Sequence, residues 1–142
     1  MLVFMFKHRM VKTLAEAGAD VSVMHVRTLK TIACLGPSTP AELAEALQRD
    51  KAQITRLVKP LIEQSYLVKS PHPTDKRSHV VALTRTGLEL MERIAKAERI
   101  ILERMTEGML ASEIEQFNAL AVRMQRNLAD RQHPACAPRD AC

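Results

Sequence analysis

Basic and hydrogen-bonding side chains are concentrated in one stretch of the chain, residues 47–85. This stretch holds eight Lys or Arg and three Asp or Glu, a net charge of +5. The whole chain of 142 residues also carries +5, from 21 basic and 16 acidic residues, so the rest balances at 13 of each. Lysine and arginine neutralise phosphates, and Arg and Gln can form paired hydrogen bonds with base edges. The stretch therefore has the chemistry of a nucleic-acid-binding surface, with a solvated basic face as the alternative.

A helix is predicted to present these side chains. Its apolar residues recur at spacings of three and four, as on a helix with one buried face: Ile54, Leu57, Val58, Leu61 and Ile62. The polar residues then lie outward: Lys51, Gln53, Thr55, Arg56 and Lys59. Asp50 is predicted to cap the first free N–H groups, with a reciprocal bond from Gln53. Pro60 removes the N–H that would pair with the Arg56 carbonyl, at a cost of about 3 kcal/mol or a kink, so we expect a bend there.

A β-hairpin is predicted after this helix. Residues 66–69 and 79–83 are short strand-like runs, and prolines at 71 and 73 favour a turn between them. The turn carries acidic and basic side chains together, namely Asp75, Lys76 and Arg77. The predicted hairpin therefore has a charged tip.

The strongest helix start in the chain is Thr39-Pro40-Ala41-Glu42. It has a capping Thr, Pro at the first helical position and Glu three residues after the Thr. Only a few residues separate the end of this helix near Leu47 from the next start at Asp50. Two short helices joined in this way form a helix-turn-helix, whose second helix normally lies in the major groove of DNA.

Longer amphipathic helices are predicted on both sides, at residues 2–17, at residues 21–35 and from about residue 86 to Gly108. A last helix begins near Ser112 and carries an apolar stripe over two heptads: Ile114, Phe117, Ala121, Met124 and Leu128. This stripe has to be covered, either by another part of the chain or by a second copy of it.

The order and spacing of these motifs resemble the MarR family of winged helix-turn-helix regulators over about residues 20–130. The resemblance is carried by four segments: Glu42-Leu43-Ala44, Ile54-Thr55-Arg56-Leu57-Val58 with Leu61, Asp75-Lys76-Arg77, and Leu83-Thr84-Arg85-Thr86-Gly87. The segment from Arg49 to Arg56 is most similar to the MexR-like branch, which represses drug-efflux genes.

The resemblance implies a mainly α fold with a small β-hairpin wing. Residues 20–86 would form the winged helix-turn-helix DNA-binding domain, residues 1–19 and 87–130 a helical dimerisation region, and residues 131–142 a flexible tail. It further implies a homodimer, built by the first helix and the last two, that binds double-stranded DNA. Such a regulator is expected to repress transcription from a palindromic operator and to be released by a small phenolic or anionic ligand or by oxidation.

Individual roles follow from side-chain chemistry and from the resemblance. Arg56 can donate two bonds to guanine or bind phosphate, and Gln53 can pair with adenine. The expected contacts to the DNA backbone come from Lys51, Thr55 and Lys59. In the family, the arginine matching Arg77 enters the minor groove and the aspartate matching Asp75 orients it through an ion pair. Lys76 is expected to face solvent or phosphate.

Other functions have less support in the sequence. It contains no glycine-rich phosphate loop and no H-E-x-x-H, Cys-x-x-Cys or Gly-x-Ser-x-Gly motif, so we expect neither an enzyme nor a cofactor. No apolar run reaches the length of a membrane span and no secretory signal is recognised, so a cytoplasmic protein is expected. The remaining alternative is a winged-helix module that binds another protein. Such a module does not need base-reading side chains beside a basic loop, whereas DNA readout needs both.

The three cysteines form an odd number, which does not indicate a disulfide framework. Cys136 and Cys142 lie near His133 in a Pro/Ala-containing tail, and their spacing matches no common metal site, so no metal is expected. Cys34 ends an apolar helical run and is predicted to be a buried packing residue. A redox sensor is the alternative interpretation of Cys34.

Overall fold

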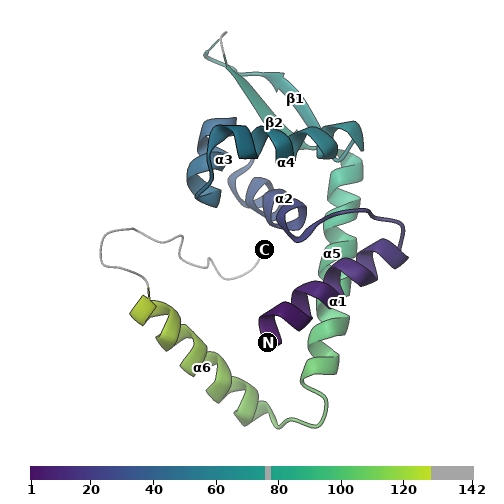
Figure 1. Ribbon diagram of the computed structural model, residues 1–142, viewed down its shortest axis with the longest axis vertical. Helices are drawn as coiled ribbons and strands as arrows, with labels where there is room; N and C mark the ends of the chain where they lie inside the picture. The colour runs from purple at the N-terminus through teal and green to yellow at the C-terminus, as the bar shows by residue number, and fades with distance from the viewer. Residues whose placement is uncertain (76–77, 129–142) are drawn as a thin grey trace. The chain divides into compact units, whose positions relative to one another are not determined.

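The structure is a computed structural model, and it describes residues 1–75 and 78–128. Within these residues the chain forms α1 (Leu2–Glu16), α2 (Val23–Leu35), α3 (Pro40–Leu47), α4 (Lys51–Glu63), β1 (Leu67–Pro71), β2 (His79–Leu83), α5 (Arg85–Met105) and α6 (Ala111–Leu128) (Figure 1). The predicted fold class, mainly α with a β-hairpin wing, is confirmed. The predicted C-terminal tail, with His133, Cys136 and Cys142, lies outside the described residues.

The chain divides into two compact units, Met1–Ile101 and Leu102–Cys142. The first unit holds α1 to α4, the hairpin and most of α5. The described part of the second unit holds the end of α5 and all of α6. The domain boundaries expected from the sequence, residues 20–86 for DNA binding with helical regions on both sides, stay a prediction.

Side chains cap α2, α3, α4 and α5 at their N-terminal ends. The Thr39 hydroxyl accepts from the Glu42 N–H at 3.3 Å, and the Glu42 carboxylate accepts from the Thr39 N–H at 2.7 Å, as predicted. The Asp50 carboxylate accepts from the Gln53 N–H at 2.8 Å, but the capping bond at this helix is not reciprocated. The predicted return bond from the Gln53 side chain is therefore wrong, and its amide stays available for other partners.

The cap of α2 is Ser22, one of the two residues that the sequence offered for this role, and His25 is its reciprocal partner. The Ser22 hydroxyl accepts from the His25 N–H at 3.1 Å, and the His25 Nδ1 accepts from the Ser22 N–H at 3.3 Å. Burial lowers the pKa of His25, and Asp20 opposes this more weakly. The lowered pKa favours the neutral ring, which is the form that can accept the bond.

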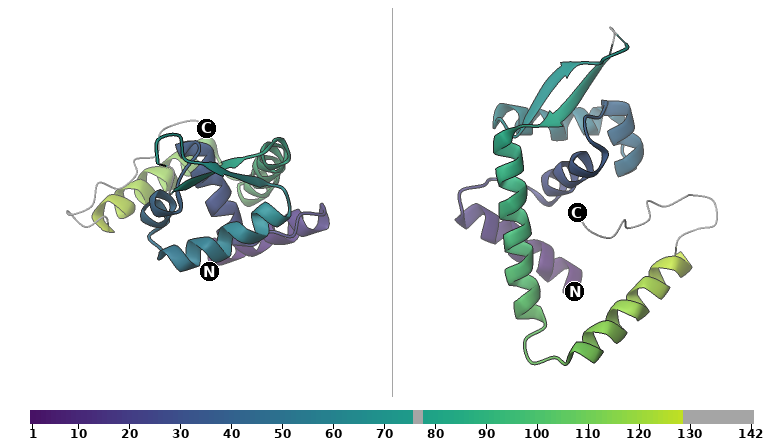
Figure 2. Two further views of the ribbon diagram at one scale, coloured as in Figure 1. Left: turned by 90° about the horizontal axis from the view of Figure 1, so that it is seen from above. Right: turned by 180° about the vertical axis from the view of Figure 1, so that it is seen from behind.

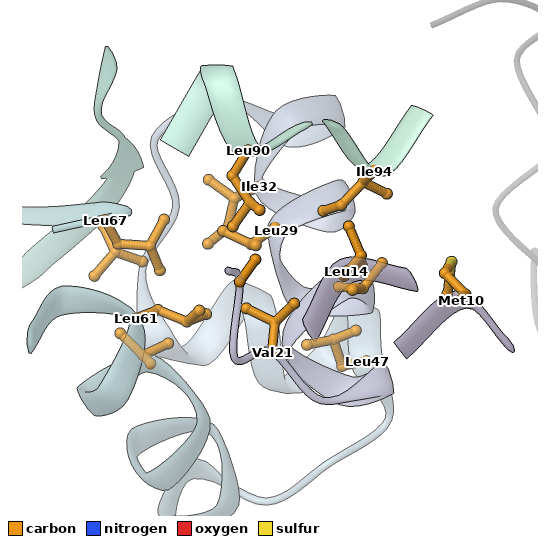
Figure 3. Packing of buried hydrophobic residues seen from close by; sticks show 14 of the residues in the cluster. Met10, Leu14, Val21, Leu29, Ile32, Leu47, Leu61, Leu67, Leu90 and Ile94 are labelled. Carbon is orange, nitrogen blue, oxygen red and sulfur yellow. The ribbon is translucent and has the colours of Figure 1, made fainter. Parts of the chain in front are cut away.

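The hydrophobic core of the first unit draws on every helix in it and on the hairpin. Figure 3 shows Leu14 of α1, Leu29 and Ile32 of α2, Leu61 of α4 and Leu67 of β1 packed together. Burying a leucine or isoleucine side chain of this kind contributes about 1.5–3 kcal/mol. The core therefore holds the helix-turn-helix and the hairpin as one body.

The hairpin is joined to the helices at its base. Its strands pair antiparallel from Leu67 opposite Leu83 to Pro71 opposite His79. A third segment adds to β2 because the N–H of Ser38 donates to the Val81 carbonyl at 3.0 Å, and the N–H of Val81 donates back at 2.8 Å. From this base the hairpin projects past α3 and α4 in the views of Figures 1 and 2.

Gly87 lies where α5 meets the hairpin, and the site has no space for a side chain. A Cβ at this position would overlap the main-chain carbonyl of Tyr66. The Gly87 N–H donates to the Thr84 hydroxyl at 2.9 Å, and that hydroxyl donates to the Ser65 carbonyl at 2.5 Å. Glycine therefore permits the close approach that fixes the start of α5 against the hairpin.

Candidate nucleic-acid interface

Helix α4 presents one buried apolar face and one exposed polar face. Ile54 and Leu61 are 0% exposed and Val58 is 7% exposed. The five polar residues expected to face outward are all exposed: Lys51, Gln53, Thr55, Arg56 and Lys59. Leu57, which the sequence placed in the core, is only partly buried and lies at the edge of the packed face. The structure therefore gathers the predicted helix residues on one accessible surface.

Two of these polar side chains have partners within their own helix. The Thr55 hydroxyl donates to the Lys51 carbonyl at 2.9 Å, so its oxygen still has lone pairs to accept another bond. Lys59 Nζ lies 3.8 Å from Glu63 Oε1, and both side chains are well exposed. An exposed pair of this type contributes roughly 0–1 kcal/mol, so Lys59 can leave it for a phosphate at little cost.

The wing residues are only partly within the described structure. Asp75 is exposed, and its main-chain N–H donates to His72 Nδ1 at 3.1 Å. Lys76 and Arg77 lie outside the described residues. Their expected DNA contacts, and the expected ion pair between Asp75 and Arg77, therefore stay predictions.

A pocket of about 350 Å³ lies between α4 and the hairpin. Its apolar lining includes Ile54, Val58 and Val81. Lys69 and His79 also line it, and the pKa of His79 is lowered by burial and by the charges of Lys69 and Lys51. The pocket thus combines an apolar lining with charged side chains of both signs, since Glu63 lines it as well as Lys69.

Sequence reasoning did not assign Lys69 or His79 to the site. Each sits on a strand, and the register pairs Lys69 with Val81 and His79 with Pro71. Side chains two positions apart on a strand point to the same face, so Lys69 and His79 share one face of the hairpin. The period-two pattern, applied to both strands in register, could have found them.

A second pocket, of about 250 Å³, lies between α2 and α4. Met24 and Leu57 form its apolar part. Arg49, Gln53 and Arg56 complete its lining. Arg49 from the turn of the helix-turn-helix therefore joins the two predicted base-reading residues at the N-terminal half of α4.

The prediction that Cys34 is buried is wrong, because the side chain is exposed and its thiol is free. The buried residues of α2 include Leu29 and Ile32. Cys34 follows Ile32 by two positions, which turns its side chain by about 200° around the helix axis, away from the core. Its place at the end of an apolar run therefore did not indicate burial.

The predicted stripe on α6 is exposed in the isolated chain. Phe117 is 55% exposed, Met124 66% and Leu128 85%. Ala121 is exposed and Ile114 is half-buried, and α6 has no buried residue. The described part of the second unit therefore does not cover this stripe by itself. None of the helices in these ranges is both long and apolar enough to cross a membrane.

Known proteins resemble the chain in sequence and in fold. The family model described as MarR family matches residues 21–79. The uncharacterised HTH-type transcriptional regulator Mb0904 of Mycobacterium bovis is 30% identical over 108 residues, covering 66% of this chain and 76% of that protein. The transcriptional regulator Tm0710 of Thermotoga maritima is 28% identical, with a TM-score of 0.66 over 89% of this chain and 90% of that one.

A mutant of E. coli MarR, solved in complex with operator DNA, has a TM-score of 0.70 over 87% of this chain and 90% of its own. It is 23% identical to this chain, so it compares the folds alone. None of these matches tests the resemblance to the MexR-like branch, which stays a prediction. Together, the family model, the mycobacterial relative and the shared winged helix establish that the chain belongs to the MarR family of helix-turn-helix transcriptional regulators.

Proposed function

We propose that the protein is a sequence-specific repressor that binds a palindromic DNA operator as a homodimer and is released by a small ligand or by oxidation. The observation that carries the proposal is the polar face of α4, whose five predicted DNA-binding side chains are all exposed while the opposite face is buried. A helix whose polar face is exposed and whose apolar face is buried in the protein can enter a major groove with its apolar side chains still covered. The MarR fold solved with operator DNA supports this use of the helix.

Base readout is assigned to the N-terminal half of α4. Arg56 is proposed to bind guanine or phosphate and Gln53 to bind adenine, and both side chains line the same pocket with Arg49. Lys51, Thr55 and Lys59 are proposed to hold the DNA backbone. The unreciprocated cap at Asp50 supports the role of Gln53, because its side-chain amide is not used to close the helix.

The wing assignments rest on the sequence resemblance alone. Arg77 is proposed to enter the minor groove, oriented by Asp75, and Lys76 to face solvent or phosphate. A narrow minor groove concentrates negative potential, which favours an inserted arginine. Arg77→Ala should therefore weaken operator binding more than Lys76→Ala, although each substitution removes one positive charge.

The dimer is proposed to form through the first helix and the last two. Large apolar side chains are exposed on each of them: Phe4 on α1 is 70% exposed, Leu102 on α5 48% and Phe117 on α6 55%. Exposed apolar side chains of this size are usually covered by a partner when they form a contiguous patch. In a two-fold dimer the same surface of each copy faces the other, so the apolar side chains of one copy can cover those of its partner.

Release by a small phenolic or anionic ligand completes the proposal. The pocket between α4 and the hairpin supports it, because an aromatic ring suits Ile54 and Val58 while an anionic group suits Lys69. A ligand bound there would lie against the helix assigned to DNA. Oxidation at Cys34 is the other proposed signal, and the exposure of that thiol makes it accessible to an oxidant.

The test is selection of DNA from a pool of random duplexes by the purified full-length protein, followed by salt titration of the selected and random duplexes. We expect an enriched inverted repeat whose half-sites are about 10 base pairs apart, because a two-fold dimer places one α4 in each major groove. Binding should weaken steeply as salt increases. A result with no enriched sequence and equal affinity for all duplexes would refute sequence-specific binding and favour a protein-binding winged helix.

A further inference from the structure

His72 closes the turn of the wing with both its main chain and its side chain. Its main-chain N–H donates to the Ser78 carbonyl at 3.2 Å, across the loop. Its ring Nδ1 lies 3.1 Å from the Asp75 nitrogen and 3.3 Å from the Thr74 nitrogen. The Ser78 N–H donates to the Asp75 carbonyl at 3.0 Å, so Asp75 is held on both sides of its main chain.

The two main-chain contacts require Nδ1 of His72 to act as an acceptor. A main-chain N–H can only donate, so Nδ1 of His72 must accept the bonds from Thr74 and Asp75 with its one lone pair. Nδ1 accepts only in the neutral ring that carries its proton on Nε2. A proton on Nδ1 would set one N–H against the two main-chain N–H groups, and both of these bonds would be lost. The Thr74 hydroxyl, 3.3 Å from Nδ1, could then accept from the ring, but it does not replace the bond to the Asp75 main chain.

We propose that His72 is a positioning residue of the wing: the neutral ring holds the Thr74 and Asp75 main chain in the shape that binds DNA, and protonation loosens that turn and weakens binding. The inference rests on the operator binding proposed above. Asp75 is the first residue of the charged tip. The bonds to its main-chain N–H and carbonyl therefore fix the position from which the tip starts. Histidine is the side chain type whose charge ordinarily changes between about pH 5 and 8, so a comparison across that range probes the proposed role.

Among the described residues, the charged groups near the ring are Glu42 on α3 and Asp75 in the loop itself. The pKa of Glu42 is lowered chiefly by its bonds from Thr39 and, more weakly, by His72. One carboxylate oxygen of Glu42 is already bonded to the Thr39 N–H at 2.7 Å and to the Thr39 hydroxyl at 2.8 Å. Glu42 is thus held on α3 by its own helix cap.

The proposal predicts a pH response opposite in sign to simple charge attraction. Adding a proton to a histidine near DNA increases positive charge and, by itself, strengthens binding to phosphates. If His72 holds the turn, the same proton weakens binding, because the bonds to Thr74 and Asp75 are lost. The sign of the response therefore separates a positioning role from a purely electrostatic one.

The experiment measures affinity for a duplex that the wild-type protein selects at about pH 8, and then again at about pH 5.5. His72→Asn supplies a side-chain oxygen that can accept the same main-chain bonds but does not titrate. His72→Phe keeps a ring but has no acceptor. His8→Gln is the control, because it removes an exposed histidine on α1 and leaves the turn intact.

We expect the wild type and His8→Gln to lose affinity relative to His72→Asn by about five- to tenfold on acidification, in line with the loss of one or two hydrogen bonds. His72→Phe should bind more weakly than His72→Asn already at the higher pH. Equal pH profiles for the wild type and His72→Asn would overturn the proposal, as would tighter binding of the wild type than of His72→Asn in acid.

A second measurement needs no DNA and tests the turn directly. In the free wild-type protein, amide hydrogen exchange at Thr74 and Asp75 should accelerate on acidification relative to the same amides in His72→Asn. Unchanged relative exchange would refute the role of His72 even if the protein binds DNA. If the DNA selection yields no preferred sequence while amide exchange behaves as expected, the proposed function is refuted. The role of His72 in fixing the turn is then still supported.

Discussion

Helices α4 and α6 are both amphipathic, but only α4 has its apolar face buried within its own unit. In α4, Ile54 and Leu61 are 0% exposed. In α6, Phe117 is 55% exposed and Met124 is 66% exposed. Helix α4 contacts α2, α3 and β1 within the first unit, whereas the described part of the second unit buries no residue of α6.

This difference indicates two kinds of partner. A helix whose apolar face is already buried offers its polar face, and on α4 that face carries Arg56 and Lys59 among other residues suited to DNA. A helix whose apolar face is uncovered gains most from burying that face, and a second copy of the chain provides a matching surface. Amphipathic periodicity alone is the same in both helices and does not make this distinction.

The largest expected effect comes from matched truncations on the two apolar faces. Ile54→Ala should lower the free energy of unfolding by about 2–5 kcal/mol, because it leaves a cavity in a closed core. Phe117→Ala should cost the folded first unit little, and its effect on unfolding should depend on protein concentration if a second copy covers the ring. Urea unfolding at two protein concentrations measures both. If both substitutions lower the free energy of unfolding equally and at every protein concentration, α4 and α6 do not differ in how their apolar faces are covered.

Charges on the stripe of α6 should affect assembly next most strongly. Replacing Phe117 and Met124 by Glu would bury unpaired carboxylates in a dimer seam, so the variant should sediment as a monomer at micromolar concentration while the wild type sediments as a dimer. The matched control is Glu115→Gln, a polar change on the same helix. A wild-type protein that is monomeric under these conditions would contradict the proposed dimer.

Substitutions on the polar face of α4 should have smaller effects that divide by role. Arg56→Ala should cost about 1–3 kcal/mol on the selected duplex and much less on random duplex, because it removes base readout. Lys59→Ala should weaken both duplexes equally and reduce the salt slope by about 1. Binding measured against salt concentration checks both variants. If both variants lose the same affinity with the same salt dependence, α4 contributes only positive charge and no base readout.

The smallest expected effect concerns Cys34, an exposed residue of α2 that belongs neither to the apolar face of α4 nor to that of α6. Cys34→Ser should change the free energy of unfolding by no more than about 0.5 kcal/mol, because an exposed side chain loses no packing. Thermal unfolding in reducing buffer measures this. A loss of several kcal/mol would show that the thiol is covered in the assembled protein. Treatment of the bound complex with mild peroxide then tests release by oxidation.

Local signals in the sequence were reliable where neighbouring residues supply the whole interaction. The Thr39-Pro40-Ala41-Glu42 start was confirmed with both capping bonds, and the apolar spacing correctly identified Ile54 and Leu61 as core. The return bond from Gln53 was wrong, although the same spacing suggested it. Capping by Asp50 was correct because its carboxylate needs only the main chain of the next turn.

Residues close together in the chain were enough to predict the order of the helices and the hairpin, the helix starts, and the concentration of positive charge in residues 47–85. Packing between distant segments had to be known to find that Cys34 is exposed, that Lys69 and His79 share a pocket with α4, and that the described part of the second unit does not bury the stripe of α6. Periodicity defines which side chains share a face, but burial depends on whether elements distant in sequence pack against that face. The contacts of His72 also depend on the fold. Thr74 and Asp75 are close to His72 in the sequence, but their N–H groups reach Nδ1 only because the hairpin turns the chain at this point.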